Sequence, residues 1–121
     1  MNYYQCSGTP FVGENLPGME SFMKAFQKYG GKARKDYYTL VSYIQGLATL
    51  EVAKRAIKNG DITRAGYAKA LAALDKWDAD GLIQPLSFKK FPYSAGIHAR
   101  ILKPDFKKST WEVVSGYAES E

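Results

Sequence analysis

Residues 36–60 constrain the fold more than any other stretch of the chain. Their apolar side chains recur with the spacing of one helix face, at Val41, Ile44, Ala48, Val52 and Ala56, widened by Leu40 and Leu47. A helix start near Asp36 or Tyr37 and a left-handed stop at Asn59-Gly60 bound this pattern. The stretch therefore predicts one long helix with an apolar face to bury. Gly46 costs up to about 1 kcal/mol there relative to alanine, which is tolerable if another backbone packs closely.

Two shorter helices are expected on either side of the long one. The first starts near Asn15 and Pro17, carries an apolar stripe and ends at residues 29–31; the stripe is Met19, Phe22, Met23 and Phe26. The other is expected over residues 64–76, capped by Thr63, with Tyr67, Leu71 and Leu74 on its apolar side. The short link at residues 59–62 predicts an antiparallel pair with the long helix.

The remaining segments have the texture of strands. Residues 1–6 and 86–88 are candidates for short strands, whereas residues 97–102 alternate with period two and residues 110–117 follow after a turn. The last two strands are expected to pair as a hairpin. The isolated chain is therefore predicted to be α+β, with three helices and a C-terminal antiparallel β hairpin in a single domain, residues 1–121.

Composition excludes several classes of protein. The 121 residues contain one cysteine, which allows no disulfide within the chain, and one histidine. No apolar run is long enough to cross a membrane, and the first residues do not form a signal peptide, so either the protein is cytosolic or its true N-terminus is missing. The net charge of +5 comes from scattered lysines and arginines. Solvated helix faces explain this charge best, with a small basic nucleic-acid binder as the weaker alternative.

Sequence motifs for catalysis and cofactors are absent. The chain has no phosphate loop, dinucleotide signature or nucleophile elbow. Asp75, Asp78 and Asp80 precede Gly81 without the spacing of a calcium loop, and His98 has no neighbour in sequence that would make it a base. We therefore expect no enzymatic activity, no cofactor and no metal.

The order of these elements resembles a known family. The matching segments are residues 17–22 and 26–30, 43–47 and 53–56, Asn59-Gly60, Ala70-Leu71, 81–88, Gly96 with 97–102, and 111–117. Taken together they are similar to the type I periplasmic binding proteins, the solute receptors of branched-chain amino acid ABC transporters. The resemblance extends from about Pro17 to Tyr117.

The resemblance implies a fragment of a two-lobe receptor. This chain corresponds to the C-terminal third of such a protein and to part of an α/β lobe, without the first lobe. The whole protein would bind an amino acid or related small organic solute in the cleft between its lobes. It would then present its closed form to an ABC permease in the periplasm. Such a protein performs no chemistry and binds no nucleic acid.

The same resemblance singles out two tyrosines as candidate ligand contacts. Tyr38 takes the place of an aromatic residue that lines the second-lobe side of the cleft, and Tyr37 adjoins it. An aromatic ring can cover an apolar solute group while its hydroxyl adds a hydrogen bond. Ordinary half-buried packing is the simpler interpretation of both. A missing lobe would also leave apolar faces uncovered, so a homo-oligomer is expected. A stand-alone α+β interaction module is the main alternative function.

Overall fold

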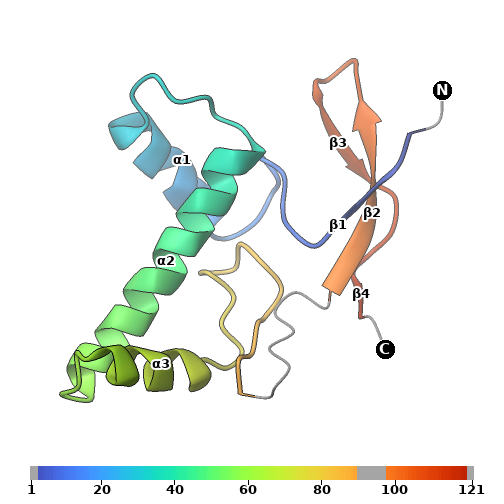
Figure 1. The fold of residues 1–121 in the computed structure, drawn as a ribbon. Coiled ribbons are helices and arrows are strands. Elements are labelled where there is room, and N and C mark those ends of the chain that lie inside the picture. Colours follow the sequence, from blue (N-terminus) through green and yellow to red (C-terminus); the bar gives the residue numbers. More distant parts are fainter. Residues whose placement is uncertain (1–2, 90–97, 120–121) are drawn as a thin grey trace.

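The computed structural model describes residues 3–89 and 98–119 and shows an α+β chain (Figure 1). Its elements follow in the order β1 (Gln5–Ser7), α1 (Met19–Tyr29), α2 (Tyr37–Lys58), α3 (Arg64–Ala72), β2 (His98–Asp105), β3 (Thr110–Val113) and β4 (Ala118–Glu119). The predicted three helices and C-terminal hairpin are confirmed. None of the described helices is both long and apolar enough to cross a membrane.

Helix α2 begins and ends where its sequence predicted. The Asp36 carboxylate accepts the backbone N–H of Thr39 at 3.1 Å, and the Thr39 hydroxyl oxygen accepts the backbone N–H of Asp36 at 3.0 Å. These reciprocal bonds form a capping box, which satisfies N–H groups that the first turn leaves unpaired. At the other end Gly60 adopts a φ of +71°, a conformation that glycine takes without strain. No other backbone packs closely against Gly46, because outside its own stretch of helix no atom lies within 4 Å of the position of an added Cβ.

Helix α1 begins later than predicted. Its N-cap is Gly18 rather than Asn15, because the residues before it form a turn in which the backbone N–H of Met19 donates to Leu16. A Cβ on Gly18 would meet Leu82 and the carbonyl of Asp80, so the close approach of that loop requires glycine here. The predicted end is confirmed, since the backbone N–H of Gly30 donates to Phe26 at 2.7 Å.

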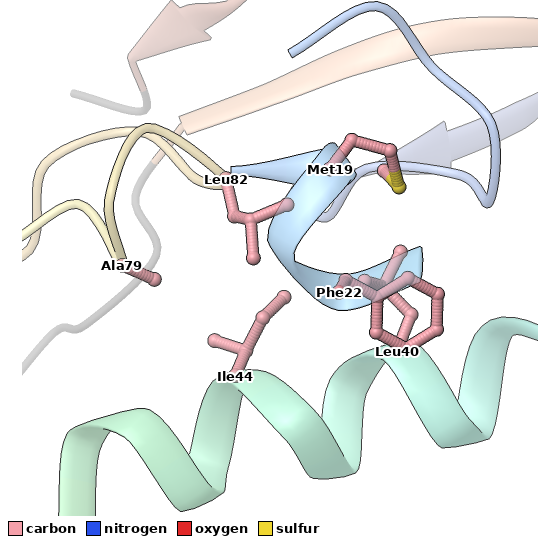
Figure 2. Close-up of a cluster of buried hydrophobic side chains, with 6 residues drawn as sticks. All are labelled: Met19, Phe22, Leu40, Ile44, Ala79 and Leu82. Carbon is pink, nitrogen blue, oxygen red and sulfur yellow. The ribbon is translucent and has the colours of Figure 1, made fainter. Parts of the chain in front are cut away.

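The main hydrophobic core lies between α1, α2 and the loop around residue 80 (Figure 2). Six buried residues form it: Met19, Phe22, Leu40, Ile44, Ala79 and Leu82. The ring of Tyr43 packs edge-on against Phe22, with centroids 5.4 Å apart. The apolar stripes predicted for α1 and α2 therefore meet in this core.

Helix α3 is shorter than predicted and packs with a different face. It ends at Ala72 rather than near Lys76, and Leu74 beyond its end is completely buried. The face toward α2 consists of small residues, since Ala70 is buried with Val52 and Ala56. The expected apolar side is partly exposed, at Tyr67 and at Leu71. Two helices approach most closely where side chains are small, which explains why the small Ala70 lies at the contact with α2.

The sheet is antiparallel and centres on β2. Strand β1 pairs along one part of β2 with Cys6 opposite Ile101, and β3 pairs further on with Trp111 opposite Pro104. Strand β4 pairs with the start of β2. The predicted strand over residues 110–117 is interrupted after Val113. The strand over 97–102 extends to Asp105, and Ile97 lies outside the described residues, as do Met1 and Asn2.

The segment at residues 86–88 is not a strand. It forms a single bridge in which Leu86 exchanges backbone hydrogen bonds with Trp77, at 2.8 and 3.0 Å. Figure 1 shows the helices at one end of the molecule and the sheet at the other, with the yellow segment that follows α3 between them. The arrangement places the N-terminal end of α2 beside the chain that leaves β1.

Candidate functional site

The N-terminal end of α2 holds both tyrosines that the sequence singled out. The capping box at Asp36 fixes where the helix starts, so Tyr37 and Tyr38 occupy its first turn. Their rings contact each other edge to face, with centroids 5.6 Å apart and an angle of 79° between the ring planes. The two side chains nevertheless have different surroundings.

Tyr37 is held by a contact from the N-terminal part of the chain. The hydroxyl of Thr9 donates a hydrogen bond of 3.2 Å to the phenol oxygen of Tyr37, across 28 positions of sequence. Thr9 is itself fixed, because the Ser7 hydroxyl donates to its carbonyl at 2.9 Å. Tyr37 is 46% exposed, so part of the residue remains accessible to solvent.

A cavity of about 240 Å³ opens beside Tyr37. It lies between the segment that follows β1, the start of α2 and the β2–β3 hairpin. Its lining combines polar side chains with apolar ones: Gln5, Ser7, Thr9, Asp36, Ser109 and Thr110 on one hand, and Pro10, Phe11, Val12, Leu102 and Trp111 on the other. Apolar walls with a few hydroxyl groups suit reversible binding of a small solute rather than acid–base chemistry.

Tyr38 lies outside this cavity. Its side chain is 76% exposed and contacts the Tyr37 ring. A surface tyrosine in this position has room to cover a ligand or a second protein surface. The structure thus separates the two candidates, since Tyr37 lines a cavity and Tyr38 projects from the surface beside it.

The least exposed ion pair among the described residues lies outside this cavity and was not predicted. Arg100 on β2 forms two hydrogen bonds of 2.6 Å to the two carboxylate oxygens of Glu14. Its side chain is 5% exposed and that of Glu14 is 12% exposed. These hydrogen bonds hold the pKa of Arg100 above its ordinary value, against the effect of burial. One sequence signal existed, because Arg100 lies two positions before Leu102 and so shares the buried face of the strand with it.

The remaining chemistry-bearing residues do not form a reactive site. Nδ1 of His98 lies 3.7 Å from a carboxylate oxygen of Glu119 at the end of the sheet. Asp75 binds the ammonium of Lys89 at 2.6 Å, which ties the end of α3 to the following segment. Among residues 3–89 and 98–119, no three His, Cys, Asp or Glu side chains gather as a metal site would require. Asp80 belongs to a turn, in which Ala79, Asp80 and Gly81 all adopt positive φ angles.

Solved structures of ABC transport proteins contain a fold similar to that of this chain. The chain superimposes on a fatty acid ABC transporter substrate-binding protein from Thermomonospora curvata with a TM-score of 0.81 and 25% identity. It also superimposes on a branched chain amino acid ABC transporter from Thermus thermophilus, solved with bound valine, with a TM-score of 0.76 and 16% identity. No protein-family model and no curated protein sequence matches the chain.

Both neighbours are much longer than this chain. The match covers 98% of this chain in each case, but 30% of the Thermomonospora curvata protein and 34% of the Thermus thermophilus protein. The chain therefore has the fold of about a third of an ABC transporter substrate-binding protein. The neighbours are transport proteins rather than enzymes, in agreement with the predicted resemblance.

Proposed function

We propose that this chain is part of the solute-recognition component of an ABC importer. The observation that carries the proposal is the superposition of nearly the whole chain on a substrate-binding protein, with a TM-score of 0.81. In this proposal residues 1–121 form one partial domain, the C-terminal third of a two-lobe receptor. The full receptor resides in the periplasm and delivers its solute to a membrane permease.

The end of α2 with Tyr37 and Tyr38 is the proposed wall of the solute cleft. Three features support this placement: a half-exposed tyrosine beside a cavity, a second ring that projects from the surface, and hydroxyl groups that line the cavity. Aromatic rings cover an apolar solute group at low entropic cost, because they have few rotatable bonds. The missing part of the receptor would supply the opposite wall.

The proposed solute is an amino acid or a related small organic molecule. One neighbour is described as a fatty acid protein and the other contains valine, so both names point to a ligand with an apolar portion. The lining of the cavity agrees with such a ligand, because Pro10, Phe11 and Trp111 offer apolar contact and Thr110 offers a hydroxyl. Binding and release of such a solute require no covalent bond to form or break.

We propose that the isolated chain, without the rest of a receptor, associates with a second copy of itself. An apolar groove of about 310 Å³ runs between α2 and α3, lined by Ala48, Thr49, Val52, Tyr67, Ala68 and Leu71. The chain spans about a third of the length of its neighbours, so further segments of a full receptor would be available to cover this groove. In a solution of the pure chain, exposed apolar surface of a second copy would take their place.

Co-expression with the adjoining coding sequence tests the proposed function. That sequence is translated, expressed together with this chain, and purified by a tag on this chain alone. The proposal expects the adjoining sequence to encode the remaining two thirds of a substrate-binding protein and to co-purify at a one-to-one ratio. An adjoining sequence of another class, or no complex between the two products, would contradict it and favour a stand-alone interaction module.

A further inference from the structure

The buried pair of Arg100 and Glu14 joins parts of the chain that are far apart in sequence. The two residues are separated by 86 positions, and both terminal nitrogens of the guanidinium bond to the carboxylate. The Arg100 carbon Cζ also lies 4.6 Å from the ring centroid of Tyr117 and 5.8 Å from that of Phe11. A planar guanidinium with two parallel bonds and aromatic neighbours holds one fixed geometry.

Glu14 transmits this geometry to the loop at residues 9–14. Its carboxylate accepts the backbone N–H of Phe11 at 3.3 Å, while its own backbone N–H donates to the Phe11 carbonyl at 3.2 Å. The carboxylate therefore closes a turn at the same time as it binds Arg100. Pro10, on the other side of Phe11, is fully buried, which leaves this part of the loop little freedom.

The opposite end of the same loop reaches the candidate solute site. Thr9 precedes Pro10 and donates its hydroxyl hydrogen to the phenol oxygen of Tyr37. Thr9, Pro10, Phe11 and Tyr37 all line the cavity of about 240 Å³. The loop thus connects the buried ion pair to the ring that faces the cavity.

We propose that Arg100 and Glu14 are positioning residues for Tyr37, acting through the loop at residues 9–14. The inference rests on the proposed solute function, which gives the position of Tyr37 its purpose. Neither Arg100 nor Glu14 is among the residues that line the cavity, so their effect on a solute is indirect. The pair fixes the loop, the loop presents the Thr9 hydroxyl, and the hydroxyl holds the Tyr37 ring.

A test needs a readout that a general loss of stability would not move. The ring signals of Tyr37 in NMR spectra of the tyrosine-labelled chain provide one, assigned through the Tyr37→Phe variant. The Thr9→Val variant removes the hydroxyl and defines the signal of an unrestrained Tyr37 ring. Tyr29 is the internal control, because it is 75% exposed at the end of α1.

The expected result is specific to Tyr37. Arg100→Lys keeps the charge but loses the paired bonds, and it should move the Tyr37 signals at least halfway to their Thr9→Val positions. The Tyr29 signals should stay in place. Glu14→Gln is the milder second variant and should move the Tyr37 signals the same way, so it decides the matter if Arg100→Lys does not fold. Tyr37 signals that coincide with the wild type in a folded variant would overturn the inference.

Solute titration separates this inference from the proposed function. In the complex with the adjoining product, Glu14→Gln should weaken solute binding about tenfold, the effect expected from one misplaced hydrogen-bonding group. Shifted Tyr37 signals without any solute binding by the wild type would contradict the proposed function but support the positioning contact. Unchanged Tyr37 signals with normal solute binding would overturn the positioning contact but leave the proposed function.

Discussion

Tyr37 and Tyr38 are neighbours in the first turn of α2, and their rings pack edge to face with centroids 5.6 Å apart. Tyr37 is restrained by Thr9 and lines a cavity, whereas Tyr38 is 76% exposed and has contact with the Tyr37 ring. The pair therefore combines one restrained ring with one that projects from the surface. This difference is the reason for proposing that the two rings form part of a binding wall.

Loss of the Arg100 guanidinium is expected to destabilise the chain strongly. Arg100→Met leaves the Glu14 carboxylate, 12% exposed, without its partner, and the loss of one member of a buried pair costs about 3–5 kcal/mol. The free energy of unfolding in urea measures the effect. Lys24→Met is the matched control, because Lys24 binds Glu20 over the same 2.6 Å at the surface and should change nothing measurable. Equal effects of the two substitutions would contradict the interpretation.

Two helical glycines should respond in opposite directions to alanine. Gly46 in α2 has open space around it, so Gly46→Ala should raise the free energy of unfolding by about 0.5–1 kcal/mol. A Cβ on Gly66 in α3 would collide with the backbone oxygen of Asp61, so Gly66→Ala should lower it by about 1–3 kcal/mol. Thermal unfolding followed by circular dichroism compares both variants. A stabilising Gly66→Ala would show that α3 does not start as described.

Acid should destabilise the chain through a set of paired carboxylates. Hydrogen bonds from Thr63, from Lys89 and from the backbone of Lys108 lower the pKa values of Asp61, Asp75 and Asp105, respectively, below 3.8. A carboxylate with a lowered pKa in the folded state contributes stability that is present above pH 3.8 and is lost as the pH falls through the lowered value.

The Asp75→Asn variant isolates one of these contributions. It should be less stable than the wild type at pH 7, and the difference should shrink as the pH falls below 3.8 and the wild-type carboxylate becomes protonated. Urea unfolding at several pH values measures both proteins. A difference that is the same at every pH would show that the ion pair with Lys89 contributes no electrostatic stability.

The apolar groove between α2 and α3 should make the isolated chain associate. Light scattering after size-exclusion chromatography is expected to give a dimer or larger species for the wild type and a smaller species for Leu71→Glu, which places a charge in the groove. Phe106→Glu is the control, because Phe106 is 84% exposed on the turn between β2 and β3. A monomeric wild type in dilute solution would refute association through this surface.

The sequence predicted those parts of the fold that depend on local patterns. The limits of α2 follow from Asp36 and from Asn59-Gly60, and both act within a few residues of themselves. The stripe with Met19 and Phe22 faces the core, because the helical period leaves one side for it. The hairpin of β2 and β3 is also local, since it joins adjacent strands.

Errors arose where packing overrides the local pattern. The sequence favoured the larger Tyr67 and Leu71 as the buried side of α3, but the close approach of α2 selects the small Ala70, and Asp61 leaves no room for a side chain at Gly66. Helix α3 ends early because Leu74 leaves the helix to enter the core, where its carbonyl accepts the backbone N–H of Phe88. A contact of this kind between separate segments cannot be recognised from the residue pattern of one helix alone.

The sequence named the two candidate tyrosines but not the contacts that surround them. The resemblance directed attention to Tyr37 and Tyr38, yet it could not indicate which of them borders a cavity. That depends on Thr9, which lies 28 positions away, and on the loop that Arg100 holds from 86 positions beyond Glu14. Hydrogen bonds over such separations follow from the assembled fold rather than from spacing in the sequence.

Solute titration of the reconstituted receptor tests the central claim most directly. Isothermal calorimetry would add branched-chain amino acids and fatty acids to the complex of this chain with its adjoining product, as wild type, Tyr38→Ala and Tyr29→Ala. The two tyrosines are matched, with 76% and 75% exposure. We expect saturable binding of one solute per complex, weakened about tenfold or more by Tyr38→Ala and unchanged by Tyr29→Ala. No binding of any such solute, or equal affinity in all three proteins, would contradict it.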